Sequence, residues 1–296
     1  MPRFFLALLV SLNVSLFYAQ VQIDTIIDLS RVKKVSIGKK VMIDGAHHNL
    51  HRINSGFSPT AILLKHMGFD VTGNDRKFNS LENLQGIDIL VIANPLSHLN
   101  RGRPVNPIFS AFEPQEIKCI ENWVTQGGSL LLIADHMPFA GAADSLARSF
   151  GIKYENGFVD GQTDRWPPHT FRRKDLTIRT EIFSKKQIDS VASFTGSALK
   201  LPVYGEPVLI FTAADTIIYP DTAWVFTPGL KRNSLEGYVQ GGIVHHGKGK
   251  VAAFGEAAMF TAQKIMPEGL KAGFNSEWAG QNIEFIQELM RYLVGR

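Results

Sequence analysis

The sequence has only one cysteine, Cys119, in its 296 residues. A single thiol excludes an internal disulfide and any zinc site built from several cysteines. Stability must therefore come from a hydrophobic core, and 45% hydrophobic residues over this length are enough to form one. Cys119 falls at a helical position in the apolar pattern of residues 117–124, so we expect it to pack inside rather than react.

The sequence also lacks a strong net charge and a second long hydrophobic run. Its formal charge is +4, and the pairs Lys33–Lys34 and Lys39–Lys40 are typical of solvated surface. Basic and aromatic residues are not interleaved, so nucleic-acid binding is not predicted. The N-terminal apolar stretch is shorter than the roughly 20 residues of a membrane span, and we expect no stable span after signal cleavage.

The first 19 residues resemble a secretory signal peptide. Arg3 precedes the apolar run 4–10, and a mixed small and apolar stretch leads to Ala19-Gln20. We therefore expect residues 1–19 to be removed and the mature protein to be periplasmic or extracellular. Phe17 departs from the small-residue rule three positions before the cut, which leaves an uncleaved anchor as the alternative. No cysteine lies nearby to carry a lipid.

Apolar strands and amphipathic helices alternate through the first half of the chain. Strands are predicted at 41–44, 70–72, 87–93 and 129–134, and helices from Ser58-Pro59, Glu113-Pro114 and Gly141. Such alternation favours right-handed crossovers and a doubly wound α/β fold with a mainly parallel sheet. Residues 20–296 are predicted to form a single domain.

The second half shows a weaker pattern. Residues 153–207 are predicted to be an irregular excursion, and its arginines 165, 172 and 173 are either solvated or able to meet an anionic or carbohydrate ligand. Further strands are expected at 208–212, 224–226, 242–245 and 251–254, either in the same sheet or in an antiparallel extension. Residues 247–250 are typical of a hairpin turn. An amphipathic helix at 283–293 closes the chain.

Polar side chains follow four of the predicted strands directly. They are Asp44, His47, His48 and His51 after the first, Asn94 and His98 after 87–93, Asp135 and His136 after 129–134, and Glu256 after 251–254. Ligands bind outside the carboxyl ends of strands in open parallel sheets. If these strands are parallel, all four groups meet at one edge.

Histidine and carboxylate side chains suit zinc or another divalent metal that activates water. In this interpretation His47, His51 and His136 bind the metal, Asp44 orients a histidine, and Glu256 is the general base. Asp135 and His136 complete the catalytic group. His48, Asn94, Thr195 and Ser197, together with Asp44, are candidate ligand-binding residues.

A purely structural role is the alternative for each of these residues. Asp44 and Asp135 would accept backbone hydrogen bonds, His48 would be an exposed loop residue, and Glu256 would cap the helix that it begins. His66, His245 and His246 fall outside the predicted edge and are left out. The motifs of zinc proteases, serine hydrolases, dinucleotide-binding proteins and phosphate loops are all missing.

Three segments carry a resemblance to a known family: 41–49, VMIDGAHHN; 123–136, WVTQGGSLLLIADH; and 254–260, FGEAAMF. Together they resemble the DUF4350 proteins, which are similar to class I glutamine amidotransferase-like domains. The resemblance covers most of residues 40–295 and implies a three-layer, flavodoxin-like α/β sandwich.

The chain departs from the amidotransferase pattern at the residues that carry its chemistry. The position of the nucleophilic cysteine holds Asp135-His136, and the later strand ends in Gly255-Glu256 without a histidine. Thiol-dependent glutaminase activity is therefore not expected.

Three functions fit these residues. The first is a metal-dependent hydrolase of a small polar or carbohydrate-like substrate. The second is a non-catalytic ligand-binding or envelope-associated module. The third is a metal-free acid/base enzyme that uses His136 with Asp135 or Glu256.

We predict that the mature protein begins at Gln20, because the signal pattern ends at Ala19. N-terminal sequencing of protein recovered from an exporting host should return QVQID. An intact N-terminus on a membrane-bound product would support the uncleaved anchor instead.

Overall fold

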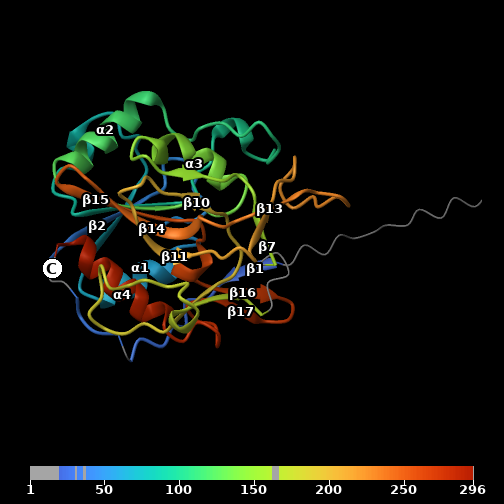
Figure 1. Cartoon of the computed structure of the whole chain (residues 1–296). Coiled ribbons are helices and arrows are strands. Elements are labelled where there is room, and N and C mark those ends of the chain that lie inside the picture. Colours follow the sequence, from blue (N-terminus) through green and yellow to red (C-terminus); the bar gives the residue numbers. More distant parts are fainter. Residues whose placement is uncertain (1–19, 31, 36–37, 162–166, 296) are drawn as a thin grey trace, which may run out of the picture.

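The computed structural model describes residues 20–30, 32–35, 38–161, 167–295 (Figure 1). These residues form one nine-stranded sheet and three smaller sheets. The predicted signal peptide lies outside the described residues. The first described strand, β1 (Gln20–Ile23), starts directly after the predicted cleavage position.

One half of the large sheet is parallel, as the sequence predicted. Its order is β3 (Asp70–Asn74), β2 (Lys40–Asp44), β4 (Ile89–Ala93), β5 (Ser129–Ile133) and β15 (Gly249–Phe254). All neighbours in this run pair in parallel. β4 and β5 are buried along their whole length, which explains their uninterrupted apolar sequences.

The other half of the sheet is antiparallel. β14 (Val239–His246) returns against β15 and also pairs with β11 (Glu206–Ile210) and β10 (Leu199–Lys200), while β6 (Lys153–Tyr154) forms the far edge. The prediction of a mainly parallel, three-layer flavodoxin-like sandwich is therefore wrong. An apolar run reports that a strand is buried, but it does not report the direction of its neighbours.

Four α-helices cover the two faces of the large sheet (Figure 1). α2 (Pro114–Thr125) and α3 (Phe139–Arg148) lie on one face, and α1 (Ser58–His66) and α4 (Asn282–Leu293) on the other. Each face has its own hydrophobic core because side chains alternate along a strand. In β4, Ile89 and Val91 belong to one core, and Leu90 and Ile92 to the other.

Three smaller sheets are attached to this framework. β1 pairs with β16 (Ala262–Met266), which pairs with β17 (Leu270–Gly273). The second joins β7 (Phe158–Asp160), β12 (Thr216–Ile218) and β13 (Arg232–Ser234). The third pairs β8 (His169–Arg172) with β9 (Ser190–Ser193).

Two sequence predictions for this region need correction. The segment 153–207 is not irregular throughout, since it contains β6 to β10. The strand predicted at 224–226 is not formed, because Trp224 lies in a turn with a positive φ of 67° and the next two residues are irregular.

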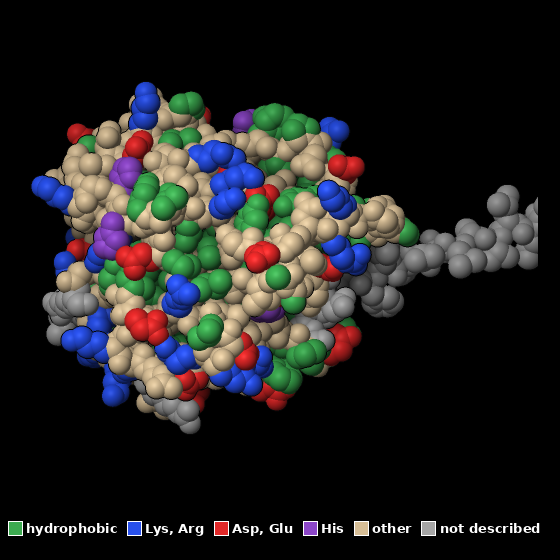
Figure 2. Space-filling view, in the orientation of Figure 1, with side chains coloured by type: hydrophobic (Ala, Val, Ile, Leu, Met, Phe, Trp, Pro, Cys, Tyr) green, Lys and Arg blue, Asp and Glu red, His purple; other side chains and the backbone are tan. Residues whose placement is uncertain are grey.

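No helix in the described ranges has the length and apolarity to span a bilayer. Lys and Arg side chains are mixed with Asp and Glu across the face drawn in Figure 2.

β15 starts where it crosses the end of α2, and this crossing requires a glycine. A Cβ atom at Gly249 would overlap the carbonyl oxygens of Val124 and Gly128. We predict that Gly249→Ala lowers the free energy of unfolding by about 1–3 kcal/mol or more, because backbone atoms cannot move aside as a side chain can. Denaturant unfolding measures this. Gly280→Ala is the control, since nothing lies within 4 Å of its Cβ position; equal losses in both variants would contradict the prediction.

Candidate functional site

The carboxyl ends of four parallel strands meet at one edge of the large sheet. β2, β4, β5 and β15 are consecutive neighbours, which confirms the arrangement predicted for the polar loops. Hydrogen bonds join these loops: Asp135 N donates to Asn94 Oδ1 at 2.9 Å, and Leu50 N donates to the carbonyl oxygen of Asn94 at 3.0 Å. The loops therefore form a connected polar structure.

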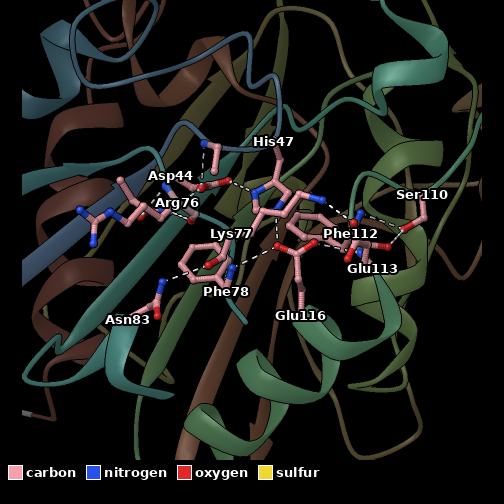
Figure 3. A network of polar contacts seen from close by, with 12 residues as sticks. Asp44, His47, Arg76, Lys77, Phe78, Asn83, Ser110, Phe112, Glu113 and Glu116 are labelled. Atoms are coloured by element: carbon pink, nitrogen blue, oxygen red, sulfur yellow. Dashed lines mark hydrogen bonds and ion pairs between the residues drawn. The ribbon is translucent and has the colours of Figure 1, made fainter. Parts of the chain in front are cut away.

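His47 lies in a buried ionic network behind this edge (Figure 3). Its Nδ1 lies 2.7 Å from Asp44 Oδ2, and its Nε2 lies 2.9 Å from Glu116 Oε1. The ring packs between Phe78 and Phe112. Because carboxylates occupy both ring nitrogens, His47 has no lone pair to offer a metal, and its predicted role as a ligand is wrong.

Two carboxylates hold His47 in its charged form. Burial alone would lower the pKa of His47, but the hydrogen bonds and charges of Asp44 and Glu116 outweigh burial and raise it to about 9. Burial would likewise raise the pKa of Glu116, yet His47 and the N–H groups of Glu113 and Phe78 lower it. An imidazolium therefore joins the β2 loop to the first turn of α2.

Glu116 is a functional position that the sequence reasoning missed. It occupies the third position of α2, where its Oε2 accepts a hydrogen bond from Glu113 N at 3.0 Å. The signal was available: Glu113-Pro-Gln-Glu116 has the spacing of a capping box. What the sequence does not reveal is that the same carboxylate also reaches His47.

A cavity of about 910 Å³ opens at the strand ends in front of this network. Its polar lining includes His51, Asp135, His136, Thr195 and Glu256. Apolar residues form the rest of the wall and include Val21, Ile23, Leu50, Phe139, Trp224 and Ile265. This size is typical of pockets for small organic molecules.

His136 is held in one tautomer at the cavity wall. Its Nδ1 lies 2.7 Å from the carbonyl oxygen of Met137, which can only accept, so Nδ1 carries the proton. The ring stacks on Phe158 at 4.4 Å, with the edge of Trp224 at 4.6 Å. Within the described ranges no hydrogen bond to Nε2 is found, so Nε2 is available as a proton acceptor.

Asp135 and Glu256 are buried carboxyl groups that interact with each other. Burial raises the pKa of Asp135; burial and the charge of Asp135 raise the pKa of Glu256 well above its ordinary value. Both Glu256 oxygens accept backbone hydrogen bonds, from Ala258 N at 2.6 Å and Met259 N at 2.7 Å. Glu256 thus holds the first N–H groups of the short 3-10 helix 258–260, which is the role that the structural alternative gave it.

His51 is neutral and incompletely satisfied. Burial and the nearby His136 lower its pKa to about 4, and its ring stacks on Phe57 at 4.9 Å. Its Nδ1 is buried without a hydrogen-bond partner, although the ring lines the cavity.

The other predicted residues lie at different depths. Thr195 lines the cavity, whereas Ser197 and Asn94 are buried and do not. His48 and His98 are exposed. Arg172 and Arg173 do not line the cavity, and Arg165 lies outside the described residues.

The predicted metal site is not assembled in the part of the chain that the structure describes. No group of three or more His, Cys, Asp or Glu side chains there could hold a metal ion. His51 and His136 do meet at the cavity, but His47 is committed to its carboxylates.

Neither a protein-family model nor a curated protein matches the sequence. Among solved structures, the fold is similar to one described as "mmIFT52 N-terminal domain", with a TM-score of 0.60 and 15% identity over 86% of this chain and 98% of that chain. Cytoplasmic protein STM1381 from Salmonella typhimurium LT2 has a TM-score of 0.47 and 13% identity, over 86% of this chain and 96% of that one. A ThuA-like protein from Bacteroides uniformis also has a TM-score of 0.47, with 12% identity, over 86% of this chain and 90% of that one. The first likeness concerns the fold alone, and the resemblance to DUF4350 stays a prediction.

We predict that His47 makes stability fall with rising pH. Its folded pKa of about 9 exceeds the ordinary 6.5, so its contribution is complete below pH 6.5 and is lost as pH rises through 9. The free energy of unfolding should fall by about 3 kcal/mol more in wild type than in His47→Gln over this interval.

Denaturant unfolding of both proteins at several pH values from 6.5 to 9.5 measures the effect. Taking their difference cancels the other titrating groups. Glu121→Gln, also on α2, is the control and should follow wild type. Parallel curves for wild type and His47→Gln would contradict a charged His47.

Proposed function

We propose that the chain binds a small organic molecule in the strand-end cavity and that His136 exchanges a proton with it, without a metal. The observation that carries this proposal is the bond from His136 Nδ1 to the carbonyl oxygen of Met137, which leaves Nε2 as the acceptor. A histidine with a fixed tautomer at the wall of a ligand-sized cavity is suited to general acid/base catalysis.

Hydrolysis of a small polar or carbohydrate-like substrate is the reaction class that we favour. His136 Nε2 would take a proton from water as the hydroxyl adds to the electrophilic carbon, and would then pass that proton to the leaving group. Asp135 contributes by position: its Oδ1 accepts the N–H of His136 at 2.8 Å and so fixes the backbone that carries the imidazole.

A non-catalytic binding module is the second candidate, and one observation favours it. Both Glu256 oxygens hold backbone N–H groups, those of residues 258 and 259, so this carboxyl group has a structural task at the site. Binding without turnover would then be the function. Under both candidate functions, export of the protein through a cleaved signal peptide stays a prediction.

We predict that His136→Gln lowers kcat by about 100-fold or more on any substrate that the wild type turns over, because it removes the proton acceptor. The substrate is found by thermal-shift screening of small molecules, followed by ester, amide and glycoside panels. Binding should persist in the variant, and EDTA should leave turnover unchanged. His66→Gln, an exposed helical residue, is the control.

Two outcomes separate the alternatives. A ligand that stabilises the protein without any turnover supports the binding module. Stoichiometric metal in the purified protein, with activity lost on chelation, contradicts metal-independent chemistry.

A further inference from the structure

The cavity lining contains carboxyl groups but no lysine or arginine side chain. The acidic residues are Asp135 and Glu256. An anionic ligand would meet carboxyl groups in a buried setting with no compensating cation, which is strongly unfavourable. The cavity therefore selects against phosphate- or carboxylate-bearing molecules.

Within the described ranges, neither acid has a lysine or arginine partner. No ion pair of Asp135 or Glu256 occurs among the described residues, although buried carboxylates are normally paired. Asp44, Glu116, Asp24 and Glu288, which are equally buried, all have ion pairs with a lysine, an arginine or the charged His47. Among the described residues, buried carboxyl groups without an ion pair are therefore found only at the cavity.

A further observation at this cavity points to an absent ligand. Trp224, 38% exposed, presents an indole at the wall and is held there by a left-handed backbone with a φ of 67°. Strained positions of this kind cluster at binding sites, and an indole face attracts cations.

We propose that the cavity binds a small molecule with one positively charged nitrogen on an apolar body, the nitrogen lying against Asp135. This assignment rests on the proposed function, because it names the ligand class of the same cavity. Asp135 is the more accessible of the two acids, at 8% exposed. Burial raises the pKa of Asp135, and a cation bound beside this carboxyl group would favour its ionised form. An ammonium group supplies N–H donors and the missing positive charge, while the apolar wall takes the body of the ligand.

Three probes of equal shape and different charge test the proposal: benzylammonium, benzyl alcohol and benzoate. Binding to the full chain is measured by calorimetry after EDTA treatment, at pH 7 and low salt. We expect benzylammonium to bind about tenfold more tightly than benzyl alcohol, with no binding of benzoate. Asp135→Asn should remove the preference for the cation, whereas Glu236→Gln, which removes an exposed acid, should keep it.

The outcomes distinguish this proposal from the function on which it rests. If benzyl alcohol or benzoate binds as tightly as benzylammonium, the cavity is a binding site but the charge assignment is wrong. If none of the three binds, the ligand class proposed here is wrong, whereas the proposed function fails only if the thermal-shift screen also finds no ligand. Because Asp135→Asn can disturb folding, the comparison of probes on wild-type protein is decisive alone. Competition by a stoichiometric divalent metal ion would also overturn the assignment, since the cation would then be inorganic.

Discussion

The buried imidazolium of His47 is the interaction on which the geometry of the site depends. It joins Asp44 at the end of β2 to Glu116 in the first turn of α2, two elements that are far apart in the chain. Every oxygen of the two carboxylates has a donor: Ala46 N and Asn74 Nδ2 for Asp44, and Glu113 N and Phe78 N for Glu116. A buried charge cluster is stable only when satisfied in this way. These contacts thus fix the first residues of the loop 44–51, and the loop then continues to His51 at the cavity.

Backbone strain is concentrated around the same edge. Among the described residues, four that are not glycine have positive φ, and three of them are His48, Asn94 and Trp224. Each lies in a segment that follows a strand or lines the cavity wall. Such conformations cost roughly 1–3 kcal/mol each, so they persist where surrounding contacts impose them. At Asn94, two hydrogen bonds offset the cost of the positive φ. Its backbone oxygen accepts a hydrogen bond from Leu50 N, and its side-chain oxygen accepts one from Asp135 N.

The sequence predicted the helices and the parallel strands because their apolar periodicities are long and uninterrupted. It predicted the convergence of Asp44, Asn94, Asp135 and Glu256 because parallel strands share one carboxyl edge. The hairpin turn expected at 247–250 indicated the antiparallel pairing of β14 with β15, but the apolar patterns did not show how much of the sheet would be antiparallel. The sequence also could not show that His47 and His51 have different surroundings. Adjacent loop residues point different ways, and only tertiary contacts show that one histidine meets Glu116 and the other meets the cavity.

The wall of the cavity joins the two ends of the chain. Val21 and Ile23 of β1 line it together with Ile265 of β16 and Ala272 of β17. During synthesis, β1 emerges first and has no partner until more than 240 residues have followed. The wall of the cavity can therefore be complete only after β16 and β17 have been synthesised, which is later than every strand of the parallel half of the sheet.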